Sequence, residues 1–174
     1  MKEMLRYGFI LALICLVASG LLATVNSLAK GKILAQVKLE EEASLREVIP
    51  EAESFQPVKH GEEIIYYQAM DKKGRPTAVV FKATNKGYSS AIETMVGMEK
   101  NGTIIAVKVL SQNETPGLGN RILQPSFTGQ FAAKNIQRLN EVQAIAGATI
   151  SSRAVLDSVK KKAEEIKGLI DNEE

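Results

Sequence analysis

The chain carries no charged residue between Tyr7 and Ala29. At about 1.5 Å per residue in an α-helix, a stretch of this length spans a hydrocarbon core of about 30 Å. We therefore predict a short cytoplasmic tail over residues 1–6 and a single transmembrane helix over residues 7–29.

A cleaved signal peptide is the alternative interpretation of this stretch. The apolar run is longer than the signal-peptide core of about 7–15 residues, which favours a retained anchor in the lipid bilayer. Cys15 follows Ile14 rather than a small residue, so it does not match a lipoprotein cysteine. Basic residues flank the stretch on both sides, and charge alone does not orient it. We expect the short tail inside and the rest of the chain on the extracytoplasmic side of the cell membrane.

The composition excludes several classes of function. About 140 of the 174 residues follow the apolar stretch, enough for one domain with a hydrophobic core. The formal net charge of +2 gives no indication of nucleic-acid binding. One cysteine and one histidine, Cys15 and His60, cannot form a His/Cys metal site, an iron–sulfur site or an internal disulfide. A redox function would therefore need an organic cofactor.

The segment after the anchor has a helical pattern. Residues 30–50 are amphipathic, and Pro50 would end a helix there. Residues 51–61, which include Pro57, indicate a loop or a short helix. We therefore expect residues 30–62 to form a helical linker.

The rest of the chain predicts one α+β domain over residues 63–174, an antiparallel sheet packed with helices. The Asn101-Gly102 pair predicts a hairpin turn. A sheet of this kind needs a helical layer on its apolar face, and residues 125–135 and the segment after Ser151 have helical patterns. The predicted strands are residues 63–70, 77–84, 90–99 and 103–111.

Residues 146–152 lie where a further predicted strand, residues 141–145, gives way to the last helical pattern. Thr149 would lie at or just before the helix N-terminus, where unpaired backbone N–H groups and the helix dipole favour a phosphate. A Ser or Thr at this place is usually an N-cap, and Ser151 or Ser152 could have that role. The Thr149 hydroxyl would then remain free to form a phosphoester.

The run from Glu114 to Gly119 also has two interpretations. Its Pro-Gly pair is typical of a rigid turn that leaves a strand. Its glycines also remove side chains that would block a flat ring, and backbone N–H groups can bond a ring's carbonyl edge. The sequence shows no supported nucleophile–base pair and no dinucleotide-binding fingerprint. We therefore expect no independent catalytic site.

Gly147-Ala148-Thr149 followed by Ser152 resembles the G-A-T-x-x-S/T flavinylation motif of the FMN-binding subunits of Rnf and Na⁺-translocating NADH:quinone oxidoreductase complexes. Ala146 departs from the Ser or Asp often found at the first position. The run from Glu114 to Gly119 resembles the second signature of this family, which lies near the flavin. The Gly87-Tyr88 pair also recurs in the family. The resemblance covers most of residues 64–170 and the single anchor.

The resemblance implies a flavoprotein in which Thr149 carries FMN through a phosphoester. A separate flavin transferase makes this bond in the family from FAD with Mg²⁺. No residue is implied to bind a metal. The other cofactor-binding residues that the resemblance implies are Gly147, Ala148, Ser152, Glu114, Thr115, Gly117, Leu118 and Gly119.

The resemblance further implies an RnfG-like electron-relay subunit, related to NqrC. Such a translocase subunit belongs to an Rnf-type complex that couples ferredoxin and NAD redox chemistry to movement of Na⁺ or H⁺. Its partners would be other membrane and peripheral subunits. An NqrC-like subunit or a stand-alone membrane-tethered flavoprotein is the alternative within this class. A cofactor-free, membrane-tethered binding module, in which Thr149 is only a cap, is the alternative from another class.

Overall fold

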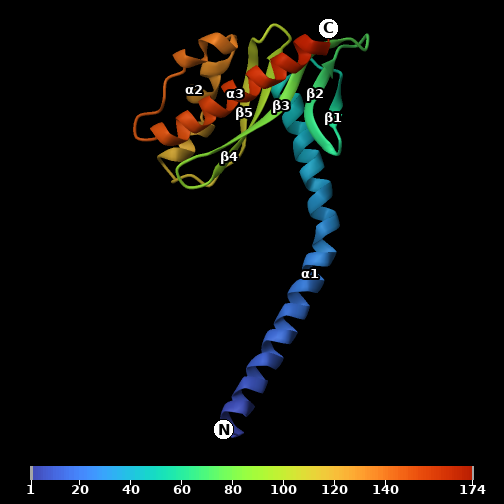
Figure 1. Cartoon of the computed structure of the whole chain (residues 1–174), viewed down its shortest axis with the longest axis vertical. Helices are drawn as coiled ribbons and strands as arrows, with labels where there is room; N and C mark the ends of the chain where they lie inside the picture. The colour runs from blue at the N-terminus through green and yellow to red at the C-terminus, as the bar shows by residue number, and fades with distance from the viewer. Residues whose placement is uncertain (1, 174) are drawn as a thin grey trace. The chain divides into compact units, whose positions relative to one another are not determined.

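The computed structural model describes residues 2–173, and the chain divides after residue 42 into two compact units. Figure 1 shows the elements coloured along the chain. The first unit consists of α1 up to Glu42, and the second begins with the last turn of α1. The elements are α1 (Lys2–Val48), β1 (Ser54–His60), β2 (Glu63–Met70), β3 (Pro76–Lys86), β4 (Ala91–Glu99), β5 (Ile104–Ser111), the 3-10 helix η1 (Gly119–Leu123), α2 (Pro125–Thr128), η2 (Gly129–Phe131), η3 (Ile136–Glu141) and α3 (Thr149–Glu173).

Helix α1 is the only helix among residues 2–173 that is long and apolar enough to cross a membrane. Its most apolar window has no side chain buried inside the protein, and leucines such as Leu11 and Leu22 are exposed. Such a surface is favourable in lipid and unfavourable in water. The helix continues past Ala29 and ends at Val48, two residues before Pro50. The helical prediction for the start of the linker is therefore confirmed.

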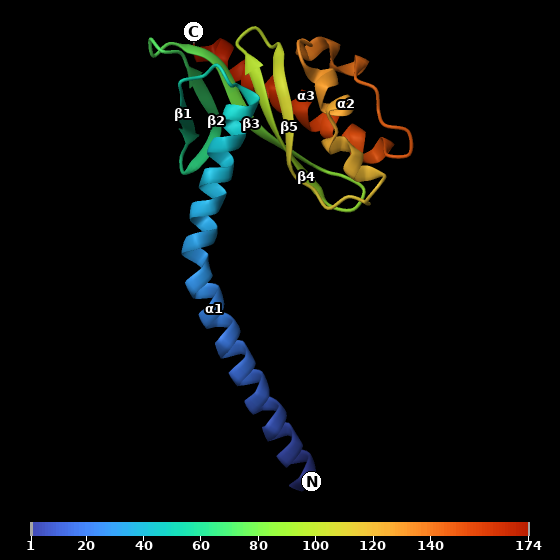
Figure 2. The ribbon, with the colours of Figure 1, turned by 180° about the vertical axis from the view of Figure 1, so that it is seen from behind.

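The second unit is organised around a five-stranded antiparallel sheet with the strands in chain order, β1-β2-β3-β4-β5. Figure 2 shows this meander from behind. β3 and β4 form a long pairing in which Ala83 lies opposite Thr94. The predicted hairpin turn joins β4 to β5, and Gly102 has a φ of 86°. The α+β class and the four predicted strands are confirmed.

Strand β1 corrects the prediction for the segment before this sheet. Residues 51–61 were expected as a loop or short helix, but Ser54–His60 form a strand paired with β2. The prediction of a helical linker to residue 62 is therefore wrong at its end. Pro57 and the mostly exposed side chains hide the strand pattern, and an edge strand tolerates both. The compact unit begins at residue 43 rather than at residue 63.

Helix α3 and the short helices cover one face of the sheet, as the two views show (Figure 1, Figure 2). Apolar residues at helical spacing on α3 pack in one core with sheet residues such as Phe81 and Val96. Phe127 and Phe131 meet edge to face, with ring centroids 5.6 Å apart. The predicted helical layer is confirmed. The fully buried apolar side chains of α3 are Val155, Val159, Ala163 and Ile166.

The opposite face of the sheet carries small residues and receives the last turn of α1 with the turn that follows. A Cβ at Gly97 would lie 2.6 Å from Cγ1 of Val48, so the close approach depends on this glycine. Lys108 of β5 also forms an ion pair with Glu47. The buried residues of this second core are Leu45, Val48, Ile49, Ala52, Ala69, Ala78, Val80 and Met95.

The connection into α3 differs from its prediction. Residues 141–145 do not form a strand; η3 ends at Glu141 and the chain then runs irregularly to α3. The Gln143 N–H donates to Oε1 of Gln130 at 2.8 Å, and the Ile145 N–H donates to Oγ of Ser152 at 3.1 Å. Because side chains satisfy these N–H groups, the segment needs no strand partner. The helix predicted over 125–135 is also shorter, since α2 ends at Thr128.

Candidate functional site

A cleft of about 540 Å³ opens at the N-terminus of α3. Its volume lies within the range of about 300–1,000 Å³ that is typical of small-molecule sites. Three segments form it: the turn between β3 and β4, the loop after β5, and the turn that leads into α3. The lining residues are Tyr88, Glu114, Thr115, Leu118, Gly119, Gly147, Ala148, Thr149, Ile150 and Ser151.

The structure brings seven of the nine predicted site residues to this cleft. Two others, Gly117 and Ser152, are absent from its lining. Gly117 lies within the loop at a φ of 76°, and Ser152 is buried. Tyr88, Ile150 and Ser151 line the cleft without having been predicted as site residues. The Gly87-Tyr88 pair was the one signal in the sequence that pointed to this turn.

Thr149 is the first residue of α3, and its side chain is exposed. The predicted helix start is therefore confirmed. The residue before it, Ala148, has no side-chain acceptor, and the first N–H groups of an α-helix have no partner within the helix. These N–H groups and the positive end of the helix dipole lie beside the Thr149 hydroxyl, which suits a phosphate group.

The two serines of the first turn do not have the predicted capping role. Ser152 Oγ accepts from the Ile145 N–H at 3.1 Å and donates to the Ala148 carbonyl at 2.9 Å. Ser151 Oγ donates to Oε2 of Glu114 at 2.5 Å. Both hydroxyls thus bind groups outside the helix or before its start. Sequence spacing could not reveal this, because Glu114 is 37 residues away from Ser151.

Glu114 is the only charged residue that is buried among the side chains that the structure describes. Its Oε1 accepts from the N–H groups of Ser89 at 3.0 Å and Ser90 at 3.2 Å, and its Oε2 accepts from the Tyr88 N–H at 3.2 Å and from Ser151. Burial by itself raises the pKa of this carboxyl. The hydrogen bonds from Ser151 and the three N–H groups outweigh burial and hold the pKa below its ordinary value of 4.5. Glu114 is therefore an anion at neutral pH.

Two glycines make room for this carboxylate. A Cβ at Gly87 would lie 2.6 Å from Oε1 of Glu114, and a Cβ at Gly119 would lie 2.9 Å from Oε2 and from Oγ of Ser151. Both distances are shorter than a van der Waals contact. Gly119 was expected to keep the cleft free for a ring, and it does line the cleft. The contacts show an additional cause, the close approach to Glu114.

The loop from Thr115 to Asn120 uses its own backbone donors. The Gly117 N–H donates to Oδ1 of Asn120 at 2.8 Å, and the Leu118 N–H donates to the Thr115 carbonyl at 3.2 Å. The expectation that the loop's N–H groups bond a ring edge is therefore wrong for these two. The internal bonds instead fix the shape of the loop.

Apolar side chains line the solvent side of the cleft. Tyr88, Leu118 and Ile150 are exposed by 68%, 49% and 57%, although exposed apolar groups gathered at one place are unfavourable in water. Gly147 has a φ of 81°, which favours glycine, and a Cβ there would be in ordinary van der Waals contact with Cδ2 of Leu118, at 3.6 Å. This arrangement offers an apolar surface beside a hydroxyl and a helix N-terminus.

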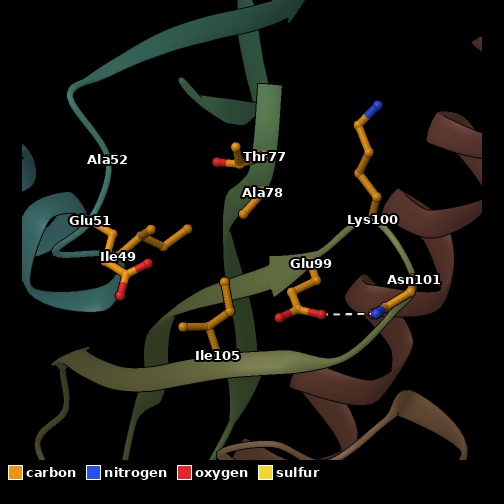
Figure 3. A pocket seen from close by; sticks show the side chains of 9 residues that line it. All are labelled: Ile49, Glu51, Ala52, Thr77, Ala78, Glu99, Lys100, Asn101 and Ile105. Carbon is orange, nitrogen blue, oxygen red and sulfur yellow. Dashed lines mark hydrogen bonds between the residues drawn. The ribbon is translucent and has the colours of Figure 1, made fainter. Parts of the chain in front are cut away.

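A second hollow, of about 370 Å³, lies on the other face of the sheet. Figure 3 shows Ile49, Ala78 and Ile105 lining it, with the Glu99 carboxylate directed to Asn101. The Asn101 amide donates to Oε2 of Glu99 at 2.8 Å. None of the predicted site residues lines this hollow.

Comparison with known proteins gives two family matches. Residues 87–164 match the FMN-binding domain family, and residues 1–48 match the RnfG N-terminal region. A relative from Photorhabdus laumondii, a subunit of an ion-translocating oxidoreductase complex, is 31% identical over 188 residues, which cover 94% of this chain and 90% of the relative. A relative from Clostridium ljungdahlii, a subunit of a proton-translocating ferredoxin:NAD(+) oxidoreductase complex, is 31% identical and covers 90% and 88%. Among solved structures, NqrC of Shewanella oneidensis matches with a TM-score of 0.48 and 20% identity, over 70% of this chain and 74% of that chain.

Proposed function

This chain belongs to the family of RnfG subunits of ion-translocating oxidoreductase complexes, and on that premise we propose that it is a membrane-anchored electron-relay subunit that carries FMN covalently on Thr149. The observation that carries the proposal is that Thr149 is an exposed residue at the start of α3 and lines a cleft of about 540 Å³. The match of residues 87–164 to the FMN-binding domain family supports FMN as the ligand.

The residues of the cleft fit both halves of FMN. The N-terminus of α3 offers backbone N–H groups and a favourable dipole to the phosphate. Tyr88, Leu118 and Ile150 offer exposed apolar surface to a flat ring system. Bound FMN would supply the electron chemistry. The protein's part is to hold the group and to set its surroundings.

Attachment requires only the Thr149 hydroxyl from this chain. In a flavin transferase, Oγ1 of Thr149 would attack the phosphorus of the FMN half of FAD. One Thr149 oxygen–phosphorus bond forms, the pyrophosphate bond breaks, AMP leaves with the electron pair, and the hydroxyl proton is released. No atom changes its oxidation state in this transfer, so no oxidant is needed. The absence of a side chain at Gly147 and the small side chain of Ala148 would ease the approach of another enzyme to the hydroxyl.

The apolar part of α1 supports anchoring in the cell membrane as a single span, because its length and composition suit a hydrocarbon core. We place the FMN domain on the extracytoplasmic side, where a covalent bond prevents loss of the cofactor. The relatives are named as subunits of complexes, so other Rnf subunits are the expected partners. The coupled process would be electron transfer between ferredoxin and NAD with movement of Na⁺ or H⁺.

Mass spectrometry of the Thr149 peptide tests the attachment. The full chain is co-expressed with a flavin transferase, and we expect this peptide to be heavier by FMN less one water. The adduct should disappear in Thr149→Ala and persist in Thr84→Ala, which removes an exposed threonine of β3. An unmodified wild-type peptide would contradict the proposal. It would favour a tethered binding module without a covalent cofactor.

A further inference from the structure

The first turn of α3 is held by two hydroxyls that act over different distances along the chain. Ser152 bonds Ile145 and Ala148, which are seven and four residues away. Ser151 bonds Glu114, which is 37 residues away. The second bond is therefore the one that links the start of α3 to the rest of the cleft.

Glu114 extends this link to the turn between β3 and β4. Its carboxylate accepts from the backbone N–H groups of Tyr88, Ser89 and Ser90 as well as from Ser151. A carboxylate has about four acceptor positions on its two oxygens, and these four donors use them. Glu114 thus has no acceptor position left for a ligand, although it lines the cleft.

The link is rigid because it is buried and closely packed. Glu114 is exposed by 5% and Ser151 by 2%. Hydrogen bonds to a charged group are stronger than neutral ones, and a low local dielectric strengthens them further. The absence of a Cβ at Gly87 and at Gly119 lets both neighbouring segments close on the carboxylate. Ser151 and Thr149 belong to the same helical turn, so what fixes one fixes the other.

We propose that Glu114 and Ser151 are positioning residues for flavin attachment, which hold the Thr149 hydroxyl at a fixed place relative to the Tyr88 turn. This inference rests on the proposed attachment of FMN to Thr149. The bond that forms is the Thr149 oxygen–phosphorus bond, as the FAD pyrophosphate bond breaks and AMP leaves. A misplacement of about 1 Å in such a step can lower the rate about 100-fold.

The decisive comparison is Ser151→Ala with Ser158→Ala. Both remove a buried hydroxyl from α3, but Ser158 Oγ donates only to the Val155 carbonyl of its own helix, at 2.8 Å. Full-length protein in detergent is incubated with the transferase, FAD and Mg²⁺, and FMN incorporation is followed by mass spectrometry. We expect Ser151→Ala to lower kcat about 10- to 100-fold with little change in KM. Ser158→Ala should stay within about twofold of the wild type.

Hydrogen exchange gives a second measurement that does not depend on flavin. We expect the amides of Tyr88, Ser89 and Ser90 to exchange faster in Glu114→Gln, because the glutamine NH₂ would face one of these donors. In Ser151→Ala they should remain protected, while the Ser152 amide, which donates to the Ala148 carbonyl at 2.9 Å, exchanges faster. Ser158→Ala should change neither group. This pattern would show that the link from the Tyr88 turn to α3 passes through Glu114 and Ser151.

The outcomes separate the two proposals. If the wild type is modified and Ser151→Ala is modified at the rate of Ser158→Ala, the positioning role is contradicted and covalent attachment stands. If the wild type is not modified at Thr149, both proposals fail. If Glu114→Gln does not fold, the comparison of Ser151→Ala with Ser158→Ala, made at a temperature at which both remain folded, still decides.

Discussion

The two faces of the sheet are closely packed by different kinds of residue. On the α3 face, large apolar side chains form the core, and one end holds the buried Glu114 carboxylate with its four donors. On the opposite face, alanines and Gly97 receive the last turn of α1 in an apolar core, and the Lys108–Glu47 ion pair lies at partly exposed side chains outside that core. The α3 face therefore combines close apolar packing with a buried carboxylate. The opposite face depends on the close packing of apolar side chains. The predicted FMN site lies at the end of the α3 face that holds the Glu114 carboxylate.

Substitution of the glycine beside Glu114 should have the largest effect. In Gly119→Ala the new Cβ would lie 2.8 Å from Cβ of Glu114 and 2.9 Å from Oγ of Ser151. We expect the free energy of unfolding to fall by about 3 kcal/mol, since overpacking here also strains a hydrogen-bonded charge. FMN incorporation at Thr149 should fall as well. Urea unfolding and mass spectrometry measure the two effects.

Gly129→Ala is the matched control for this substitution. A Cβ at Gly129 would meet nothing within 4 Å, and its φ of −65° suits alanine. Stability and FMN incorporation should both stay close to those of the wild type. If Gly119→Ala behaved in the same way, the close packing around Glu114 would have no energetic consequence.

The glycine on the other face tests whether the two faces are independent. In Gly97→Ala the Cβ would lie 2.6 Å from Cγ1 of Val48 and 3.0 Å from Cγ1 of Ile49. These atoms belong to apolar side chains rather than to a hydrogen-bonded charged group, so we expect a smaller loss of stability, about 1–2 kcal/mol. Folded Gly97→Ala protein should incorporate FMN at the wild-type rate. A lower rate would show that the packing of α1 on the sheet reaches the cleft.

The sequence predicted the elements better than the contacts between them. Hydrophobic periodicity located the strands from Glu63 onward and the start of α3, because each is a local pattern repeated over many residues. Strand β1 was not predicted, because an exposed edge strand that contains Pro57 lacks that pattern. Residues 141–145 were assigned to a strand because side-chain partners such as Gln130 and Ser152 are not visible in a local window.

The same limit applies to the candidate site. Seven of the nine predicted residues line the cleft because two motifs, each contiguous in sequence, meet there. The bond between Glu114 and Ser151 spans 37 residues, and nothing in either motif specifies it. The roles of Gly87 and Gly119 follow only when the carboxylate between them is seen. Short motifs therefore indicate where a site lies, and tertiary contacts show how its parts are held.

Acid should weaken the α3 face through Glu114. The pKa of this carboxyl is lowered in the folded protein from its ordinary value of 4.5, so its contribution is complete above about pH 4.5 and is lost as pH falls through the lowered value. The stability difference between wild type and Glu114→Gln should therefore narrow as the pH falls below about 4.5, through the lowered pKa of this carboxyl. Urea unfolding at several pH values measures this difference. The stability difference between wild type and Gly97→Ala should not change with pH. If it narrowed in the same way, protonation of Glu114 would not be the cause of the narrowing.

Substitution of Thr94 should have the smallest effect on stability, and it tests whether a further polar group stabilises the α3 face. Its Oγ1 is buried and has no hydrogen-bond partner within residues 2–173. Thr94→Val keeps the shape and removes a hydroxyl whose desolvation is not offset, so we expect stability to rise by about 1 kcal/mol. FMN incorporation should not change, because Thr94 does not line the cleft. If the substitution instead lowered both stability and incorporation, the Thr94 hydroxyl would stabilise the α3 face, contrary to its lack of a hydrogen-bond partner among the described residues.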